Sequence, residues 1–544
     1  MTGQSNTPGM QTTWENWSGN LQHKPPTDGD GYYFKPTTLD ELKTVLTTAK
    51  ALGATVRVSG QRHSQPPLVA DDNRSNPPAK PDTLLVDMSC YIDIGEAGIR
   101  LGPGENQITM NPGVREDVVD AFLTRNNLMF STVTAGGFFS IGGMTAVDVH
   151  GGTLAAPIFA ETASAFTILG ADGTETVIDA STQATGKWRP LQFARVSLGG
   201  LGIVTRITID VLPRPYATTV QGRTDRHLLQ NRRAFIDKFK TLTAQFDRME
   251  VFYSPYAAAP NVPFVPLPNF LVLGWNIVAN PDPKTPNSAP DPTSACVLAE
   301  KGEFGAPFLG GLAGYGAKYV RESQYFSNPY NPLHLPPVPT AGFAAIALDE
   351  IESQAGAANA KHSDLWLSEA SQVMFMSYFF EMPNFDDAGL GKVWDGMDVV
   401  ARRVIQDGNF HIAAPMEFRF IKAGDSAMSG AYSENPDATF VNLDLIGFIE
   451  PTPSANYPQA LLQFFADVER DWVAMGGVPH NGKMYGFYDP SAPAGSYTAA
   501  FNPNFLSALR ARRGERLTAF SAYRKARDPD GLFYNAYLRQ LLEG

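Results

Sequence analysis

The N-terminal part of the chain alternates a helical pattern with strand patterns. Apolar residues recur every three or four positions across Leu39–Leu52, which predicts a helix with one buried face. Thr38 and Glu41 have the spacing of a capping box, and Gly53 is typical of a helix end. The β-branched run at 55–58 then predicts a strand that enters a Ser-Gly-Gln-Arg turn.

Strand patterns continue along the whole chain. The segments 166–170 and 174–179 flank an Ala-Asp-Gly turn and predict a hairpin. The segments 372–380, 416–420 and 440–449 are apolar and indicate an antiparallel sheet. A helix is predicted at 457–475. The predicted strands are 83–87, 166–170, 174–179, 203–212, 372–380, 416–420 and 440–449.

The length favours two domains, because 544 residues exceed what one hydrophobic core usually holds. Helices and strands mixed around glycine-rich turns predict a fold of the α+β class. We expect a first domain at 1–215 and a second at 216–480, with an antiparallel sheet and helices. A C-terminal segment at 481–544 is expected to return to the first domain.

Charge and cysteine content exclude several classes of protein. The net charge of −12, without a long basic run, argues against a nucleic-acid partner. The basic cluster Arg510–Arg513 is interpreted as a solvated helix face. Cys90 and Cys296 form no CxxC pair, so neither a disulfide framework nor a metal site is expected. Stability is therefore expected to come from packing.

The N-terminal sequence and the hydropathy predict a soluble protein. Residues 1–17 have neither the basic head nor the apolar run of a signal peptide. No stretch reaches about 18 apolar residues, so no membrane span is expected. A cytoplasmic location is the default expectation, and secretion is the alternative if a leader was removed upstream.

Three glycine-rich turns, at 59–64, 134–153 and 197–202, carry the strongest chemical signal. A strand that ends in a glycine turn exposes successive N–H groups, which can hold a diphosphate. None of the turns fits the G-x-G-x-x-G pattern of a Rossmann site, so an extended dinucleotide that passes several turns is favoured. His63 closes the first turn. The alternatives are a surface histidine and tight hairpins in a β-rich core.

These turns resemble a known flavoprotein family. VRVSGQRHS, TAGGFFSIGGMTAVDVHGG and SLGGLGIVTRITIDVLPRP, in this order and spacing, look like the FAD-binding domain of the vanillyl-alcohol-oxidase superfamily. S-I-G-G-x-x-A-V-x-x-H-G and the C-terminal D-P-x-x-x-F-x-N-x-Y are similar to type II, covalent-flavin cholesterol oxidases and related alcohol oxidases. The resemblance covers the first 215 residues and reappears in PMEFRF, NLDLIGF and GGVPHNGK. It implies a PCMH-type FAD-binding domain followed by a substrate-binding cap.

The resemblance implies that the pyrophosphate of FAD lies on the first turn. The matching histidine of the family carries a covalent bond to the flavin 8α-methyl group, so His63 is the expected anchor. Arg62 departs from the small residue that often precedes this histidine. His150 is interpreted as a flavin-edge or structural residue. The residues expected to hold FAD are His63, Ser59, Gly60, Gln61, Arg62, Ser64, Gly136, Gly137, Ser140, Gly142, Gly143, Val147, His150, Gly151, Gly202, Ile203, Val204 and Asn535.

An acidic and a basic residue two positions apart are the first candidates for catalysis. Glu417 and Arg419 share one face of a strand and match the E-x-R pair of related alcohol oxidases. The resemblance implies that Glu417 takes the hydroxyl proton while Arg419 stabilises negative charge on the reduced flavin. A surface ion pair is the alternative.

A second group of catalytic candidates lies nearby in the sequence. VPHNGK resembles the P-H-W-G-K segment of sugar-alcohol and aldonolactone oxidases, with Asn481 in place of the aromatic residue. His480 and Lys483 are therefore expected near the flavin or the substrate oxygen, unless this is a solvated turn. Glu381 and Asp444 stand where sterol-oxidase relatives carry polar site residues, and strand-edge positions are their alternative.

These residues predict an FAD-dependent alcohol oxidase. A base takes the hydroxyl proton, a hydride passes to flavin N5, and dioxygen accepts the electrons to give hydrogen peroxide. The aromatic and Met residues of 375–380 suggest a bulky apolar alcohol such as a sterol. The alternatives are an oxidase or dehydrogenase of polyols, sugars, lactones or small phenolic alcohols, and a binding protein without redox chemistry.

Overall fold

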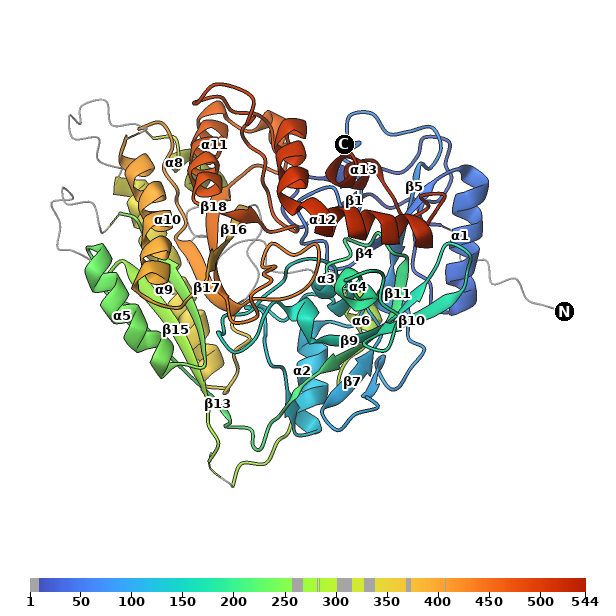
Figure 1. The fold of residues 1–544 in the computed structure, drawn as a ribbon, viewed down its shortest axis with the longest axis horizontal. Coiled ribbons are helices and arrows are strands. Elements are labelled where there is room, and N and C mark those ends of the chain that lie inside the picture. Colours follow the sequence, from blue (N-terminus) through green and yellow to red (C-terminus); the bar gives the residue numbers. More distant parts are fainter. Residues whose placement is uncertain are drawn as a thin grey trace.

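The computed structural model describes residues 9–256, 268–280, 282, 284–300, 316–326, 338–367, 373–406 and 408–544. Figure 1 shows the N-terminal strands and α1 on the right, and a large sheet with its helices on the left. No helix in the described ranges has the length and apolar character needed to cross a membrane.

The strands are β1 (Trp14–Glu15), β2 (Gln22–His23), β3 (Tyr33–Phe34), β4 (Thr55–Ser59), β5 (Thr83–Asp87), β6 (Ile99–Leu101), β7 (Gln107–Met110), β8 (Leu128–Met129), β9 (Ala163–Leu169), β10 (Glu175–Asp179), β11 (Ile203–Asp210), β12 (Leu212–Pro213), β13 (Val220–His227), β14 (Arg248–Tyr253), β15 (Phe270–Ile277), β16 (Val373–Met382), β17 (Met416–Lys422), β18 (Thr439–Phe448) and β19 (Val478–Pro479). The helices are α1 (Leu39–Leu52), α2 (Glu116–Arg125), α3 (Ile141–Ala146), α4 (Pro190–Ala194), α5 (Arg232–Gln245), α6 (Ala295–Glu300), α8 (Ala317–Ser323), α9 (Val338–Asn359), α10 (Asp387–Gln406), α11 (Gln459–Ala474), α12 (Pro503–Arg527) and α13 (Ala536–Leu542). Short 3-10 helices are η1 (Met88–Cys90), η2 (Phe159–Thr162) and η3 (Ser454–Asn456).

A parallel sheet of order β3-β5-β4 opens the fold. Helix α1 lies between β3 and β4 in the chain. It begins where predicted, because the Thr38 side chain accepts a hydrogen bond from the backbone N–H of Glu41. The helix ends at Gly53, whose φ of 68° suits glycine. The predicted helix and the strands at 55–58 and 83–87 are thus confirmed.

The second sheet has the order β10-β9-β11-β7-β6, and every pairing in it is antiparallel. The predicted hairpin is the β9–β10 pair, and the predicted strand at 203–212 is β11. The glycine-rich segment 134–153 contains the short helix α3, which the sequence pattern does not predict because glycine is a weak helix former. Its Ile141 and Met144 are buried in the core.

The third sheet is antiparallel and has the order β13-β15-β14-β17-β18-β16-β19. It contains the predicted strands as β16, β17 and β18, although residue 372 lies outside the described residues. The predicted helix at 457–475 is α11. Because β14, β17, β18 and β16 are neighbours, their side chains can meet on one face of the sheet.

The C-terminal helices α12 and α13 lie beside the N-terminal strands (Figure 1). The Val56 N–H of β4 donates to the Leu532 carbonyl over 2.7 Å, which joins the tail to the first sheet. Helix α12 bends at Gly514. The interpretation of 510–513 as a solvated face is wrong for Arg513, which is 2% exposed and donates to Asn481 Oδ1 over 2.6 Å. The reason is that α12 packs this side chain against the loop after β19.

A disulfide joins Cys90 and Cys296, which are 206 positions apart in the sequence. The expectation that packing alone provides the stability is therefore wrong. Spacing could not reveal this pair, because only the folded chain brings α6 against η1. Met88 and Ser89, which precede Cys90, line the cavity described below, so the bond holds α6 beside the cavity wall.

We expect reduction of this disulfide to lower the free energy of unfolding by about 2–4 kcal/mol, because a long loop of the unfolded chain is released. Urea unfolding with and without dithiothreitol measures the difference. A Cys90→Ser, Cys296→Ser double variant should unfold at the lower urea concentration in both conditions. An unchanged midpoint of the wild-type protein on reduction contradicts this expectation.

Candidate active site

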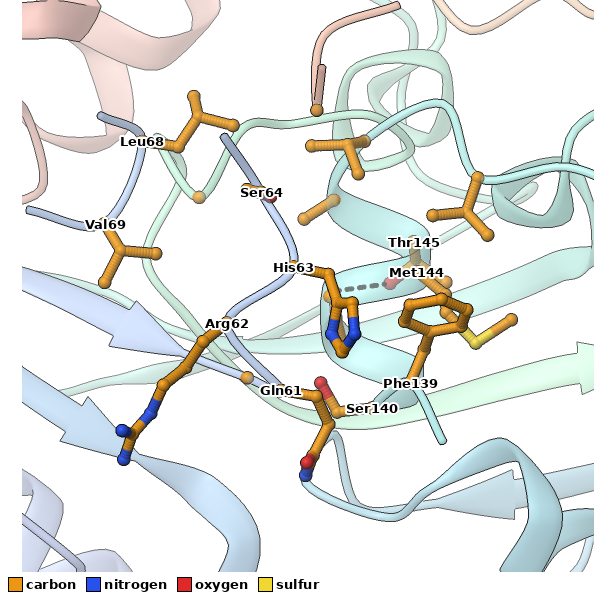
Figure 2. A pocket seen from close by; sticks show the side chains of 18 of the residues that line it. Gln61, Arg62, His63, Ser64, Leu68, Val69, Phe139, Ser140, Met144 and Thr145 are labelled. Carbon is orange, nitrogen blue, oxygen red and sulfur yellow. Dashed lines mark hydrogen bonds between the residues drawn. The ribbon is translucent and has the colours of Figure 1, made fainter. Parts of the chain in front are cut away.

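A cavity of about 280 Å³ lies where the three sheets meet. Its wall takes residues from all three glycine-rich turns, and charged residues of β17 and β18 form what is called its charged end. Figure 2 shows the part formed by the first turn and by the helix that carries Met144 and Thr145. The predicted glycine turns and the predicted catalytic strand therefore share one cavity.

The first turn carries His63 into an aromatic environment. The His63 ring stacks 5.2 Å from the rings of Trp17 and Phe138, and its edge contacts Phe139 at 4.6 Å. Arg62 extends to the other side of the loop (Figure 2), where its guanidinium donates to the Tyr33 hydroxyl over 3.1 Å. Arg62 has a φ of 63°, an uncommon conformation for a residue with a side chain.

The turns around the cavity approach one another closely. A Cβ atom at Gly60 would lie 2.3 Å from Ser140 Oγ, so only glycine lets the first and second turns touch. In the third turn Val196 and Leu198 also have left-handed φ angles, of 52° and 55°. Strained non-glycine residues of this kind cluster at ligand sites.

Arg57 of β4 holds this arrangement together from the centre. Its side chain is buried and donates hydrogen bonds to four backbone carbonyls, of Leu68, Leu198, Gly199 and Phe533, over 2.6–2.9 Å. Burial lowers the pKa of Arg57 to about 10, and the nearby Asp71 and Asp528 carboxylates oppose that shift. The sequence analysis missed this residue, although a lone arginine within an apolar strand is a usable signal.

The structure brings most of the predicted cofactor residues to the cavity wall. These are Ser59, Gly60, Gln61, Arg62, His63, Ser64, Ser140, Gly142, Gly143, Val147, His150, Gly202 and Val204.

Five predicted cofactor residues lie outside the wall. Gly136 and Gly137 pack against Phe138 and Leu365, and Gly151 faces the backbone of Val133. Ile203 is buried in the core of the first sheet. Asn535 caps α13 and donates to the Pro67 carbonyl over 2.9 Å. Each of these residues shapes the fold beside the cavity.

The charged end of the cavity is built on Arg419. Its guanidinium forms an ion pair with Glu417 on the same strand, and lies 3.6 Å from Glu250 Oε1 on β14. The Arg419 guanidinium also donates a hydrogen bond to the His150 carbonyl over 3.2 Å. Glu250 is buried and accepts a hydrogen bond from the Trp366 ring nitrogen over 2.7 Å. The alternative of a surface ion pair is excluded, since Glu417 is 7% exposed.

Asp444 and Lys483 face this pair. Asp444 stands opposite Glu417 in the β17–β18 register, and both line the cavity. Burial and the Glu417 carboxylate raise the pKa of Asp444 to about 6. Burial lowers the pKa of Lys483, while Asp444 and Glu417 act in the opposite direction. The Lys483 ammonium lies 4.0 Å from the centre of the Phe375 ring.

Two histidines complete the wall, with ring centres 6.1 Å apart. His150 Nδ1 lies 3.0 Å from the Gly151 carbonyl, so this nitrogen carries a proton in the neutral ring. His480 Nδ1 instead accepts from the Gly482 N–H over 2.9 Å. Burial lowers the pKa of both rings well below the ordinary value, and cationic neighbours add to the shift. Both imidazoles are therefore neutral at neutral pH, with opposite tautomers.

Two expectations about the cap differ from the structure. Glu381 does not reach this cavity: it lines a second one, where Ser433 donates to its carboxylate over 2.6 Å. Of the aromatic run at 375–380, Phe375 lines the cavity, whereas Met376, Tyr378, Phe379 and Phe380 lie in the main hydrophobic core. Strand β16 is covered on both faces, so its apolar run fills the core.

Glu250 and Asp148 were missed by the sequence analysis. Asp148 lies within the second glycine-rich segment and binds the loop of His480 and Lys483: its Oδ2 accepts from the Asn481 N–H over 2.8 Å. Its position next to the predicted histidine motif was the available signal. Glu250 carries no local motif and reaches the site only because β14 pairs with β17.

Comparisons with known proteins match two parts of this chain. Residues 31–179 match the family described as an FAD binding domain, and residues 397–541 match the family described as D-arabinono-1,4-lactone oxidase. The chain is 24% identical over 201 residues to L-gulonolactone oxidase of Mus musculus, which covers 37% of this chain and 40% of that protein. It is 22% identical over 252 residues to D-arabinono-1,4-lactone oxidase of Yarrowia lipolytica, covering 44% and 41%. The chain thus spans about two fifths of these curated relatives.

Solved structures extend the likeness to the whole fold. A solvent-stable cholesterol oxidase superposes with a TM-score of 0.67 at 17% identity, covering 99% of this chain and 100% of the other. Cholesterol oxidase from B. sterolicum gives 0.65 at 15% identity, covering 99% of both chains. Together, the fold and the domain matches define a flavoprotein with an FAD-binding domain and a second domain. The two family matches support the resemblance to PCMH-type FAD-binding flavoproteins of the vanillyl-alcohol oxidase superfamily, and they indicate FAD as the cofactor.

The cavity fits this cofactor. Its glycine-rich end exposes backbone at the three turns, and apolar side chains such as Val58, Leu68 and Val69 form part of the wall. The close contact of Gly60 with Ser140 and the strained Arg62 and Leu198 backbones are features of a built ligand site. The turn at 59–64 would hold the diphosphate. His63 is part of the cavity wall, where it contacts three aromatic rings.

Proposed function

We propose that this protein oxidises a CH–OH group of a sugar lactone or a related polyhydroxy compound, with dioxygen as the electron acceptor. The observation that carries the proposal is the cluster of charged groups around Arg419 in the cavity wall. The match of residues 397–541 to the lactone-oxidase family and the two lactone-oxidase relatives support the substrate class.

The charged end favours a polar substrate. Each unpaired hydroxyl that is buried costs about 1–3 kcal/mol, so a polyhydroxy substrate needs partners along the wall. Glu417, Asp444 and Lys483 offer such partners, and Asp444 Oδ1 has no hydrogen-bond partner among the described residues. The same groups would be desolvated without compensation by an apolar ring system.

Asp444 is the proposed proton acceptor in place of Glu417. The Glu417 carboxylate is held by Arg419, which makes it a stable negative charge. The Asp444 carboxylate has a raised pKa near 6 and can take the hydroxyl proton at neutral pH. Lys483 stabilises the negative charge that develops on the substrate oxygen. FAD, when bound, supplies the two-electron acceptor.

Oxidation of a sterol is the second candidate. Aromatic side chains in the wall, Trp17, Phe138, Phe139 and Phe375, favour it. Against it stands the burial of most of the 375–380 run in the core, which removes the apolar cap surface expected from the sequence. A comparison of turnover with a lactone and with a sterol distinguishes the two candidates.

We expect L-gulono-1,4-lactone or D-arabinono-1,4-lactone to reduce the yellow enzyme under anaerobic conditions and to yield hydrogen peroxide in air. Cholesterol dispersed in detergent is the matched comparison. A peroxide assay coupled to peroxidase measures both. Turnover of cholesterol without turnover of any lactone or polyol would falsify the proposed substrate class, and no turnover with either would contradict an oxidase.

We propose that His63 carries the flavin covalently, since it lies in the cavity wall among three aromatic rings. Acid precipitation of the wild-type protein should leave the yellow colour in the pellet, and His63→Ala should release it to the supernatant. His150→Ala is the matched control and should keep its colour in the pellet. Colour that stays with precipitated His63→Ala points to another attachment residue.

The pH dependence of kcat/KM tests Asp444. Because the base must be ionised, activity should fall as the pH drops below an apparent pKa near 6. Asp444→Asn should lower kcat/KM by about 10²–10⁴-fold and remove this acid limb. Asp437→Asn, at an exposed loop position before β18, is the control. An unchanged acid limb in Asp444→Asn would assign the proton to another group.

A further inference from the structure

A second cavity, of about 570 Å³, lies beside the bend of α12. Its wall contains the guanidinium groups of Arg512, Arg513 and Arg516, and the rings of Trp188 and Tyr432. The Arg516 guanidinium lies 4.7 Å from the centre of the Tyr432 ring. Gly514, where the helix bends with a φ of 51°, lies between these arginines and brings them to one cavity.

The three arginines bind backbone carbonyls and an amide, all of which are uncharged. Arg512 donates to the Gly476 and Gly477 carbonyls, over 2.6 and 2.8 Å. Arg516 donates to the carbonyls of Ala427 and Ser429, over 3.1 and 2.8 Å. Arg513 donates to the Asn481 side chain over 2.6 Å. No carboxylate within the described ranges lies within 4.0 Å of these guanidinium groups.

The acidic residues of the same cavity are engaged elsewhere. Glu515 pairs with Lys187 over 2.8 Å, and Glu434 lies 4.0 Å from the same ammonium group. Glu381 accepts a hydrogen bond from Ser433. The three arginines therefore leave a local surplus of positive charge in a protein whose net charge is −12.

Arg513 shows the strongest sign of a missing partner. It is 2% exposed, and its Nε and Nη1 atoms have no hydrogen-bond partner among the described residues. Burial lowers the pKa of Arg513, and burial lowers the pKa of Arg516 to about 9. The Asp148 carboxylate, which is linked to Arg513 through Asn481, acts to raise the pKa of both arginines but offsets the effect of burial only in part. A buried cation with unpaired donors is costly, and an anion in the cavity would reduce that cost.

We propose that this cavity is a binding site for a small molecule that carries an oxyanion, which is either a phosphate group or a carboxylate group. Guanidinium groups match both of these oxyanions, since their planar N–H donors can bind two oxygens at once. The rings of Trp188 and Tyr432 contact the cations of Lys187 and Arg516 and hold them at the wall of the cavity. A volume of about 570 Å³ leaves room for more than a bare ion.

The site is linked to the loop of the catalytic candidates. Arg513 holds Asn481, and Asn481 donates to Asp148 over 2.8 Å from its backbone and over 2.6 Å from its side chain. Asn481 follows His480 directly and precedes Lys483 by two positions. Arg513 thus joins the wall of the second cavity to the segment that carries those two side chains. The binding site itself does not depend on the proposed oxidase function.

The test uses the full-length flavoprotein with inorganic phosphate and malonate as probes. Both are titrated by isothermal calorimetry and thermal unfolding, with sodium chloride at equal ionic strength as the reference. We expect saturable binding of at least one probe that chloride does not reproduce. The better probe tells whether the natural ligand carries a phosphate or a carboxylate. An equal effect of chloride, or no binding of either probe, overturns the proposal.

Variants locate the binding. Arg512→Gln with Arg516→Gln should weaken the probe's affinity by about tenfold or more, because charge-assisted hydrogen bonds are lost. Arg510→Gln is the matched control: Arg510 lies on the same helix and binds the Gln540 carbonyl outside the cavity. Unchanged affinity in the double variant, or an equal loss in the control, contradicts the site.

A measurement on the wild-type protein covers the case in which the double variant does not fold. Phenylglyoxal modifies accessible arginines, and mass spectrometry locates the modified positions. The bound probe should protect Arg512 and Arg516 at least about fivefold against modification, and should leave Arg510 unprotected. Equal modification of all three arginines with and without the probe overturns the proposal.

Discussion

One buried arginine holds the cofactor cavity in shape. Arg57 sits in a strand of the first sheet, where its charge is stabilised by four backbone carbonyls from three separate segments. One segment is the loop that follows β4, one is the third glycine-rich turn, and one is the C-terminal tail. Losing this side chain would leave four buried acceptors without donors, so the turns that surround the cavity depend on it.

The chemistry of the cavity depends on the register of the large sheet. Antiparallel pairing sets Arg419 opposite Glu250 and Glu417 opposite Asp444, so charges from three strands meet at one end. Burial, followed by the Glu417 carboxylate, raises the pKa of Asp444. Burial acts to lower the pKa of Arg419, but the Glu250, Glu417 and Asp444 carboxylates outweigh it, so Arg419 stays charged. A slip of one residue in this register would turn the same side chains into the core.

Short motifs indicated much of the candidate site. Strand β4 and its turn were recognisable from local pattern, whereas the E-x-R pair and the His480–Lys483 loop were recognised through the family resemblance, because each motif lies within a few residues of sequence. Glu250 and the Cys90–Cys296 disulfide were not, since each acts with a partner far away in the chain. The aromatic run at 375–380 was read as a substrate surface, and α10, α11 and the neighbouring strands instead cover most of it.

The sequence by itself predicted most of the elements and a dinucleotide site at the glycine turns, and the family resemblance of its motifs added FAD. Periodicity, caps and glycine turns act between residues a few positions apart, so they are legible along a single chain. Only the tertiary structure decided which side chains face a cavity, that the pKa of Asp444 is raised, and that three arginines of α12 line a second cavity. These properties arise from burial and from electrostatic interactions between distant segments of the chain. A local sequence pattern does not show which distant segments come into contact, because the hydrophobic effect is not directional.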